Sequence, residues 1–262
     1  MKVFSRFLFG SFALLVGMMG SMSNAHAASK TICAAGCDYT SIGEAFSGDG
    51  AAGEEYVVQG GGGSPYDPSV EGWNISFPNA SSTLRCTGGA VIGQTNPAGS
   101  NRLYMTTDST VRDCSFDNIT LATASDLGGG TPNNVNILNN TFSSATGTVL
   151  FASGGTSFSI KDNTNIHLIY LQSTTTLGVI ENNTFYGDNR LALSASMLVT
   201  DATTTNVQIL SNTFTNRSSS VNGGQGLISL RGDSFTFATN TVRYAVEVSD
   251  SSLESSVVVS AS

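Results

Sequence analysis

An Asn-Thr-Phe motif recurs along this chain and constrains its fold more than any other feature. It occurs in "NILNNTFSS", "VIENNTFYG" and "QILSNTFTN", and related segments are "TVRDCSF", "FSIKDNTN" and "FTFATNTV". Aligned on one position, which we call the ladder position, the six segments carry Cys114, Asn140, Asn163, Asn183, Asn212 and Asn240. Successive ladder positions are 20 to 29 residues apart. A short period of this kind predicts a solenoid of stacked coils.

Residues at fixed offsets from the ladder position also agree with one another. Three residues before it stand Val111, Ile137, Ile160, Ile180, Ile209 and Phe237. One residue after it stand Ser115, Thr141, Thr164, Thr184, Thr213 and Thr241, which we expect to face outward. Two residues after it stand Phe116, Phe142, Asn165, Phe185, Phe214 and Val242, which we expect in the core. Short β-branched and aromatic runs between polar turns indicate strands, so the pattern predicts an all-β parallel β-helix.

The ladder asparagines and the segment "GCDYTSIGEAF" together resemble the right-handed parallel β-helix proteins of the pectate-lyase-like superfamily. The resemblance implies stacked, inward asparagines at the bend after the second strand, at positions 140, 163, 183, 212 and 240. It also implies a short helix over the first coil, where Ser41 and Glu44 match a capping box and Ile42, Ala45 and Phe46 share one face. An asparagine suits such a bend because its amide can donate to a carbonyl and accept from the next asparagine.

The first 27 residues have the composition of a secretory signal peptide. Lys2 and Arg6 precede the apolar run "FLFGSFALLVGMM", and Ala25 and Ala27 are small residues at the cleavage positions. The run is shorter than the roughly 20 apolar residues of a membrane span, although an uncleaved anchor is the alternative. We therefore predict a signal peptide at 1–27, an N-terminal segment with the capping helix at 28–53 and the β-helix at 54–262. The predicted location is extracellular, periplasmic or on the cell surface.

Four cysteines follow the predicted signal peptide, and an exported protein is expected to form disulfides. We expect Cys33 to pair with Cys37, and Cys86 with Cys114, because 28 residues separate the second pair, which is one coil of the repeat. Stacked strands lie about 4.8 Å apart, within reach of a disulfide. Unbridged thiols and a zinc site of all four cysteines are the alternatives; the spacing lacks the paired C-x2-C of common zinc sites.

The net charge limits the classes of partner. Removing residues 1–27 removes Lys2 and Arg6 and takes the formal charge from −8 to −10. A chain this acidic, without a basic run, is not expected to bind nucleic acid. It would also repel acidic polysaccharides unless a cation bridged the two.

Catalysis is the second hypothesis for function, and it rests on the family resemblance. A lyase of this superfamily is expected to need calcium held by clustered carboxylates, and a basic residue that removes a proton from a uronic-acid polymer. The candidates are Arg231, Asp233, Glu247, His167 and Arg190, with Asp201 and Asp250 as further carboxylates. They are scattered over different coils, so the favoured hypothesis is a non-catalytic protein that binds carbohydrate or acts as an extracellular scaffold.

Two further features suggest other interactions. Seven residues before the ladder position stand Thr107, Asn133, Thr156, Thr176, Thr205 and Asp233, a polar column that suits an ordered lattice such as ice, or only a soluble turn. The C-terminal segment "SSLESSVVVSAS" is strand-like and offers no second capping helix. An open parallel edge invites pairing, so we expect the C-terminal end to contact a partner or a second copy.

Overall fold

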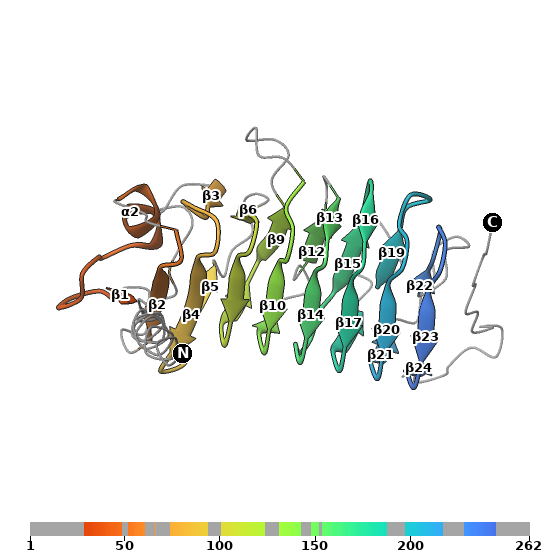
Figure 1. The fold of residues 1–262 in the computed structure, drawn as a ribbon. Helices are drawn as coiled ribbons and strands as arrows, with labels where there is room; N and C mark the ends of the chain where they lie inside the picture. The colour runs from red at the N-terminus through yellow and green to blue at the C-terminus, as the bar shows by residue number, and fades with distance from the viewer. Residues whose placement is uncertain are drawn as a thin grey trace, which may run out of the picture.

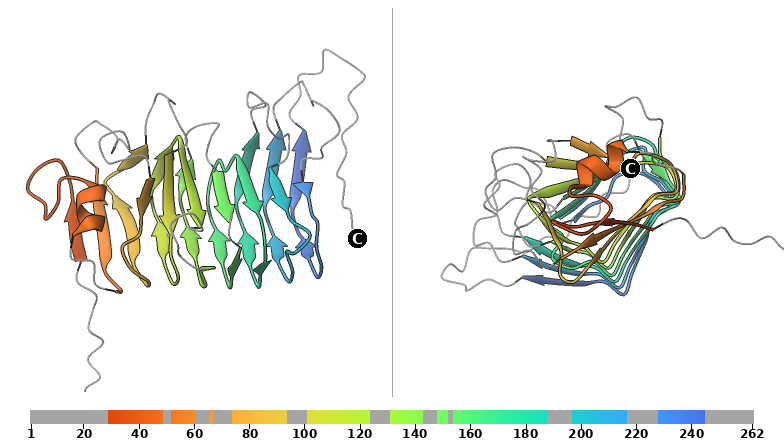
Figure 2. Two further views of the ribbon diagram at one scale, coloured as in Figure 1. Left: turned by 90° about the horizontal axis from the view of Figure 1, so that it is seen from above. Right: turned by 90° about the vertical axis from the view of Figure 1, so that its left-hand side faces the viewer.

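The computed structural model describes residues 29–48, 52–60, 66, 74–93, 101–123, 131–142, 148–151, 154–187, 197–216 and 228–244. These residues form a parallel β-solenoid in which the coils stack along one axis (Figure 1). Viewed along that axis, the coils superimpose (Figure 2). The predicted signal peptide at 1–27 lies outside the described residues.

The largest sheet of the described residues has nine parallel strands, one from each successive coil. In spatial order they are β1 (Ser29–Ile32), β2 (Glu55–Gln59), β4 (Thr83–Thr87), β7 (Thr110–Arg112), β10 (Asn136–Leu138), β14 (Ser159–Lys161), β17 (Val179–Glu181), β20 (Gln208–Leu210) and β23 (Thr236–Ala238). We call this the nine-stranded sheet. Its strand β1 lies within the predicted N-terminal segment 28–53.

A second sheet of seven parallel strands forms another side of the solenoid, and we call it the seven-stranded sheet. Its strands in spatial order are β3 (Asn74–Ser76), β6 (Asn101–Met105), β9 (Ile119–Thr123), β12 (Thr148–Phe151), β15 (Leu168–Leu171), β19 (Leu198–Thr200) and β22 (Ile228–Ser229). The smaller sheets contain β5 (Val91–Gly93), β8 (Ser115–Asp117) and β11 (Thr141–Phe142); β18 (Thr184–Gly187), β21 (Thr213–Asn216) and β24 (Thr241–Tyr244); and β13 (Gly155–Thr156) with β16 (Thr175–Thr176).

The strand register is the one that the repeat predicts. Ile160 pairs with Ile137 on one side and with Ile180 on the other, and Ile209 pairs with Phe237. The outward residues follow the same register, and Lys161 Nζ lies 2.8 Å from Glu181 Oε2 across adjacent coils.

The predicted core column two residues after the ladder position is confirmed where it holds phenylalanine, whereas Val242 is only partly buried and Asn165 is exposed. Phe116, Phe142, Phe185 and Phe214 are fully buried, and the rings of Phe185 and Phe214 stack with 4.4 Å between their centroids. In the third coil the prediction of Asn165 is wrong. Asn165 is exposed with a left-handed backbone (φ 58°), and Ile166 takes the inward place opposite Phe185. One extra residue therefore shifts the pattern by one position in this coil.

The asparagine ladder forms as predicted. The Oδ1 atom of each ladder asparagine accepts hydrogen bonds from the preceding coil: Asn163 Oδ1 accepts from the backbone N–H and the Nδ2 of Asn140 at 2.9 and 3.0 Å. Each Nδ2 also donates to a carbonyl one coil earlier, as Asn163 does to Ile137 at 2.9 Å. The N-terminal end of the ladder is Cys114, whose backbone N–H donates to Asn140 Oδ1 at 3.0 Å.

Left-handed residues form two corners of the coils. One corner is the residue before the ladder position: Asp113, Asn139, Asp162, Asn182, Ser211 and Thr239. The other is six residues before the ladder position: Asp108, Asn134, Ser157, Leu177, Asn206 and Ser234. Short polar side chains tolerate this conformation best because they can hydrogen-bond locally. The exposed asparagines of "NILNNTF" and "VIENNTF" are thus Asn139 and Asn182 at a corner, beside buried Asn140 and Asn183.

Both predicted disulfides are present. The Cα atoms are 5.5 Å apart in Cys33–Cys37 and 4.8 Å apart in Cys86–Cys114. The second bond joins adjacent coils at the N-terminal end of the ladder, which excludes the four-cysteine zinc site.

A short helix, α2 (Ile42–Ser47), lies where the sequence predicts it and buries Ile42, Ala45 and Phe46. The Ser41 hydroxyl accepts from the Glu44 N–H at 3.0 Å, as a capping box requires. The Glu44 carboxylate reaches one residue further back than expected, and accepts from the Thr40 N–H at 3.1 Å. The helix contacts β1 and β3 near the N-terminal end of the solenoid.

Candidate functional site

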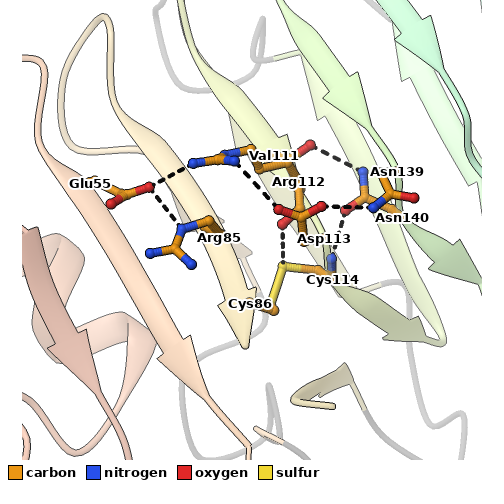
Figure 3. A network of polar contacts seen from close by, with 9 residues as sticks. All are labelled: Glu55, Arg85, Cys86, Val111, Arg112, Asp113, Cys114, Asn139 and Asn140. Atoms are coloured by element: carbon orange, nitrogen blue, oxygen red, sulfur yellow. Dashed lines mark hydrogen bonds and ion pairs between the residues drawn. A yellow bond between two sulfur atoms is a disulfide. The ribbon is translucent and has the colours of Figure 1, made fainter. Parts of the chain in front are cut away.

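Four charged residues form a cluster on the outer face of the nine-stranded sheet. Arg85 of β4 and Arg112 of β7 are paired in register, and both contact one carboxylate oxygen of Glu55 on β2 (Figure 3). The Arg85 Nε–Glu55 Oε1 and Arg112 Nη2–Glu55 Oε1 distances are both 2.9 Å. Arg112 Nη1 also lies 3.5 Å from Asp113 Oδ2. The cluster therefore joins three successive coils through ion pairs.

Ion pairing favours the charged forms of Glu55 and Arg85. The hydrogen bond from Arg85 lowers the pKa of Glu55; partial burial opposes this effect and the hydrogen bond from Arg112 adds to it. The hydrogen bond to Glu55 likewise raises the pKa of Arg85. A guanidinium with a raised pKa holds its proton more tightly, so Arg85 is poorly suited to act as a general base. The arrangement suits stabilisation of the sheet surface.

Two of the candidate lyase residues, Arg231 and Asp233, lie at the bend that follows β22. The backbone N–H of Arg231 donates to Thr200 Oγ1 at 2.6 Å, and the Thr200 hydroxyl donates to the Arg231 carbonyl at 2.7 Å. The backbone N–H of Asp233 donates to the Thr204 carbonyl at 3.1 Å. The side chains of Arg231 and Asp233 are exposed, and the backbone of the bend is held by the Thr200 hydroxyl and the Thr204 carbonyl.

The other candidates are placed differently. Asp201 follows β19 as Arg231 follows β22, and these strands pair at Val199 and Ser229, so Asp201 and Arg231 occupy the same bend in adjacent coils. His167 precedes β15 and therefore lies at the N-terminal ends of the parallel strands, whereas Asp201 and Arg231 lie at their C-terminal ends. Strand β15 is also two strands away from β22. Arg190, Glu247 and Asp250 lie outside the described residues. The structure brings Asp201, Arg231 and Asp233 to one bend and separates His167 from them.

In the part of the chain that the structure describes, no group of three or more His, Cys, Asp or Glu side chains could hold a metal ion. No ligand set for the calcium ion of a lyase is therefore identified among these residues.

A shallow depression of about 220 Å³ lies between α2 and β3. Its lining carries no ionisable side chain: it consists of Gly43, Phe46, Ser47, Asn74, Ile75 and Ser76. This lining offers neither a general acid or base nor a charged group for substrate.

An apolar column runs along the outer face of the seven-stranded sheet. The residues of this outer-face column are paired in register on five successive strands: Tyr104, Ala122, Leu150, Tyr170 and Val199. Tyr104 and Ala122 are buried and pack with half-buried Leu150 in a cluster separate from the solenoid core. Tyr170 and Val199 are half-buried. The inward residues between them, such as Leu103, Ile169 and Leu198, belong to the core.

Polar groups border the outer-face column. Arg102 Nη1 lies 3.4 Å from the hydroxyl of Tyr104 on the same strand. Thr120 and Thr148 continue the row of Arg102 on β9 and β12. The half-buried part of the column, formed by Leu150, Tyr170 and Val199, combines accessible apolar surface with a polar border, which is the composition of a binding surface.

Sequence reasoning missed this column, although the strands carry a signal for it. In "NRLYM", "TVLF" and "LIYL" the residues on both faces include large apolar side chains, whereas a strand with one solvated face alternates apolar and polar residues.

The threonine column predicted for lattice binding is stacked in register. Asn133 pairs with Thr156, Thr156 with Thr176, Thr176 with Thr205, and Thr205 with Asp233. Thr156, Thr176 and Thr205 are half-buried, and the column is flanked by the second left-handed corner.

Comparisons with protein-family models, with curated proteins and with solved structures gave no match to this chain. Among the described residues no helix is long and apolar enough to cross a membrane.

Proposed function

We propose that this protein is a secreted or cell-surface β-solenoid that binds carbohydrate and does not convert it chemically. The observation that carries the proposal is the outer-face column, in which half-buried Tyr170 lies between half-buried Leu150 and Val199 on the neighbouring strands. Tyrosine offers an apolar ring face and a hydroxyl, which suits the C–H faces and hydroxyls of a sugar ring. Stacked parallel strands repeat about every 4.8 Å, so the surface is periodic, as a polysaccharide chain is.

Charge favours a neutral polysaccharide as the ligand. The chain carries 19 acidic residues and 11 basic ones, and at least two of the basic residues are committed to Glu55. An acidic polymer would meet repulsion along the solenoid.

The proposal also covers the superfamily to which this solenoid belongs and the location of the protein outside the cytoplasm. A nearly all-β parallel solenoid with an inward asparagine ladder, a short N-terminal helix and two disulfides supports a right-handed coil of the pectate-lyase-like kind. The disulfides support export, guided by residues 1–27 as a signal peptide.

A calcium-dependent polysaccharide lyase is the second candidate. The meeting of Asp201, Arg231 and Asp233 at one bend favours it, because carboxylates and a cation next to a sheet face are the groups that β-elimination needs. Lattice binding by the threonine column is the third candidate, and the register of Thr156, Thr176 and Thr205 favours it.

Binding assays with matched tyrosine variants test the proposal. The protein is mixed with insoluble neutral and acidic polysaccharides, and the bound fraction is measured for the native chain, Tyr170→Ala and Tyr186→Ala. Tyr186 is a half-buried tyrosine of β18, on a different sheet, and serves as the control. We expect neutral polymers to retain the native chain and Tyr186→Ala. Tyr170→Ala should bind these polymers at least about tenfold more weakly than the native chain, as expected for the loss of one central aromatic contact.

The lyase candidate is tested in the same samples by the ultraviolet absorbance of unsaturated products, with calcium or with chelator. Calcium-dependent product that disappears in Arg231→Ala would replace the binding proposal with the lyase. Equal retention of both tyrosine variants would exclude the outer-face column as the binding surface. Inhibition of ice growth that is lost in Thr176→Val would support the third candidate.

A further inference from the structure

The C-terminal end of the described solenoid exposes the inside of its last coil. Phe237 of β23 is 39% exposed, whereas Ile209, at the same position one coil earlier, is fully buried. Phe235 and Val242 of the same coil are only partly buried. Burial of apolar surface stabilises a protein by about 25 cal/mol per Å² of area removed from water. A further layer of chain that covers this end would therefore stabilise the solenoid. That layer must match the parallel register of the coil beneath it.

Backbone donors at the first corner show what the next layer must supply. The left-handed residue before each ladder position donates its N–H to the residue two positions before the next ladder position. The N–H of Asn182 donates to the Leu210 carbonyl at 3.0 Å, and that of Ser211 to the Ala238 carbonyl at 3.1 Å. The same bond occurs in three earlier coils, from Asp113 to Leu138, from Asn139 to Lys161 and from Asp162 to Glu181. By this rule the N–H of Thr239 requires a carbonyl from a strand beyond β23.

The second corner makes the same requirement. There the left-handed residue donates to the residue seven positions before the next ladder position, as Leu177 does to Thr205 at 3.3 Å and Asn206 to Asp233 at 3.1 Å. The N–H of Ser234 is the next in this series. Two donors, at fixed places on the open end, therefore point to one more coil of the same repeat.

The sequence that follows Tyr244 contains such a repeat. The last six residues, "VVVSAS" at 257–262, align with "QILSNT" at 208–213, which forms β20 and its corner. The alignment puts Val258 at the inward position of Ile209, Ser260 at the corner position of Ser211 and Ala261 at the ladder position. Ala261 follows Asn240 by 21 residues, within the range of 20 to 29 for the other coils.

The residues directly after Tyr244 match the other sheet. In "AVEVSD", Val246 and Val248 flank Glu247. In the coil below, buried Ile228 and Leu230 flank Ser229, which is outward. The segment 245–262 thus holds, in the right order, an apolar pair for the seven-stranded sheet and an inward valine for the nine-stranded sheet.

We propose that residues 245–262 dock on the open end as a further coil of the solenoid. Val258 covers Phe237, and the carbonyl oxygens of Val259 and Glu254 accept from the N–H groups of Thr239 and Ser234. Alanine at position 261 ends the ladder, because its side chain has no amide to bond to another coil. The docked segment covers the edges of β22 and β23, which would otherwise pair with another chain. The segment itself therefore replaces the expected partner or second copy at this end.

Amide hydrogen exchange of the full chain tests the docking, with the amide of Ser211 as an internal reference. We expect Thr239 and Ser234 to exchange slowly, as Ser211 does, at every protein concentration. Val258→Asp places a charge in the interior and should speed exchange of Thr239 and Ser234 about tenfold or more, while Ser211 stays slow. Val257→Asp is the matched control: the same change one residue earlier, on the outward side, should leave all three amides slow.

Several results would overturn the proposal. One is exchange of Thr239 in the native chain at the rate of an unstructured peptide. Another is protection of Thr239 that appears only as protein concentration rises, which would assign the end to a second copy. Equal effects of the Val257 and Val258 substitutions, or no effect of either, would exclude the proposed register.

Discussion

The side-chain oxygen of Asn212 accepts two hydrogen bonds from Asn183, one from its backbone N–H and one from its Nδ2, both at 2.9 Å. Asn183 Nδ2 also donates to the carbonyl oxygen of Ile160 at 2.8 Å. One buried amide thus joins three consecutive coils. Leaving such groups unpaired costs about 1–3 kcal/mol each, so the ladder contributes to stability mainly by preventing that cost.

The first prediction is that Asn183→Ala destabilises the solenoid by at least about 2 kcal/mol, because more than one buried group loses its partner. The backbone N–H of Asn163 would lose its Asn183 acceptor, Asn163 Nδ2 would lose one of its acceptors, and the Ile160 carbonyl would lose a donor. Urea unfolding followed by circular dichroism measures the effect. Asn136→Ala is the control, since Asn136 is half-buried on the outer face and its side chain donates to the carbonyl of nearby Asn134. Equal midpoints for the two variants would contradict this account.

Most of the fold could be predicted from the sequence because buried positions repeat with strict chemistry. The inward places of Ile137, Asn140 and Phe142 must be filled in every coil, so they recur in the sequence and reveal the register. Asn165 shows the limit: a left-handed residue absorbs one extra position, and an alignment by fixed offsets then chooses the wrong inward residue.

The candidate binding surface could not be predicted in the same way. Outward residues such as Tyr104 and Tyr170 are not required by the coil, so they need not recur at every turn. Their alignment depends on the register between strands that loops of different length separate. Only the pairing seen in the structure places them in one column.

The second prediction concerns the disulfides. The Cys86–Cys114 bond spans 28 residues and the Cys33–Cys37 bond spans 4. In the loop-entropy model the longer loop is worth about 3 to 4 kcal/mol and the shorter about 2. Replacing both cysteines of the 86–114 pair by alanine should therefore lower Tm clearly more than the same change in the 33–37 pair. An equal loss from both double variants would show that loop closure does not dominate.

The third prediction is a pH dependence from Glu55. The folded-state pKa of Glu55 is lowered by Arg85 and Arg112, so its ion pairs stabilise the fold fully above the unfolded pKa of about 4.3. That contribution is lost as pH falls through the folded pKa. Glu55→Gln should therefore be less stable than the native chain by about 1 kcal/mol at pH 7, and equally stable in sufficiently acidic solution.

A second ion pair provides the control for Glu55. The side chains of Lys161 and Glu181 are 35% and 39% exposed, so solvent screens their attraction. Glu181→Gln should change stability by about 0–1 kcal/mol at pH 7. A pH-independent difference between the native chain and Glu55→Gln would contradict the assignment of the effect to the carboxylate.

The fourth prediction comes from the close packing of Phe158 on Gly178 in the next coil. A Cβ atom built on Gly178 would lie 1.9 Å from the nearest ring atom of Phe158, which is itself buried. The same inward position, five residues before the ladder position, holds Val135 one coil before Phe158 and Val207 one coil after Gly178. The large ring therefore occupies the space that a valine at position 178 would need.

Gly178→Val should accordingly destabilise the solenoid by about 1–3 kcal/mol through overpacking. Phe158→Val alone should also destabilise it, by leaving a cavity. Combined, the two changes restore a valine in each of these coils, so the double variant should be more stable than the sum of the single losses predicts, with a coupling of about 0.5–3 kcal/mol. Urea unfolding of the four proteins measures this coupling. Additive losses would mean that Phe158 and Gly178 do not share one packing space.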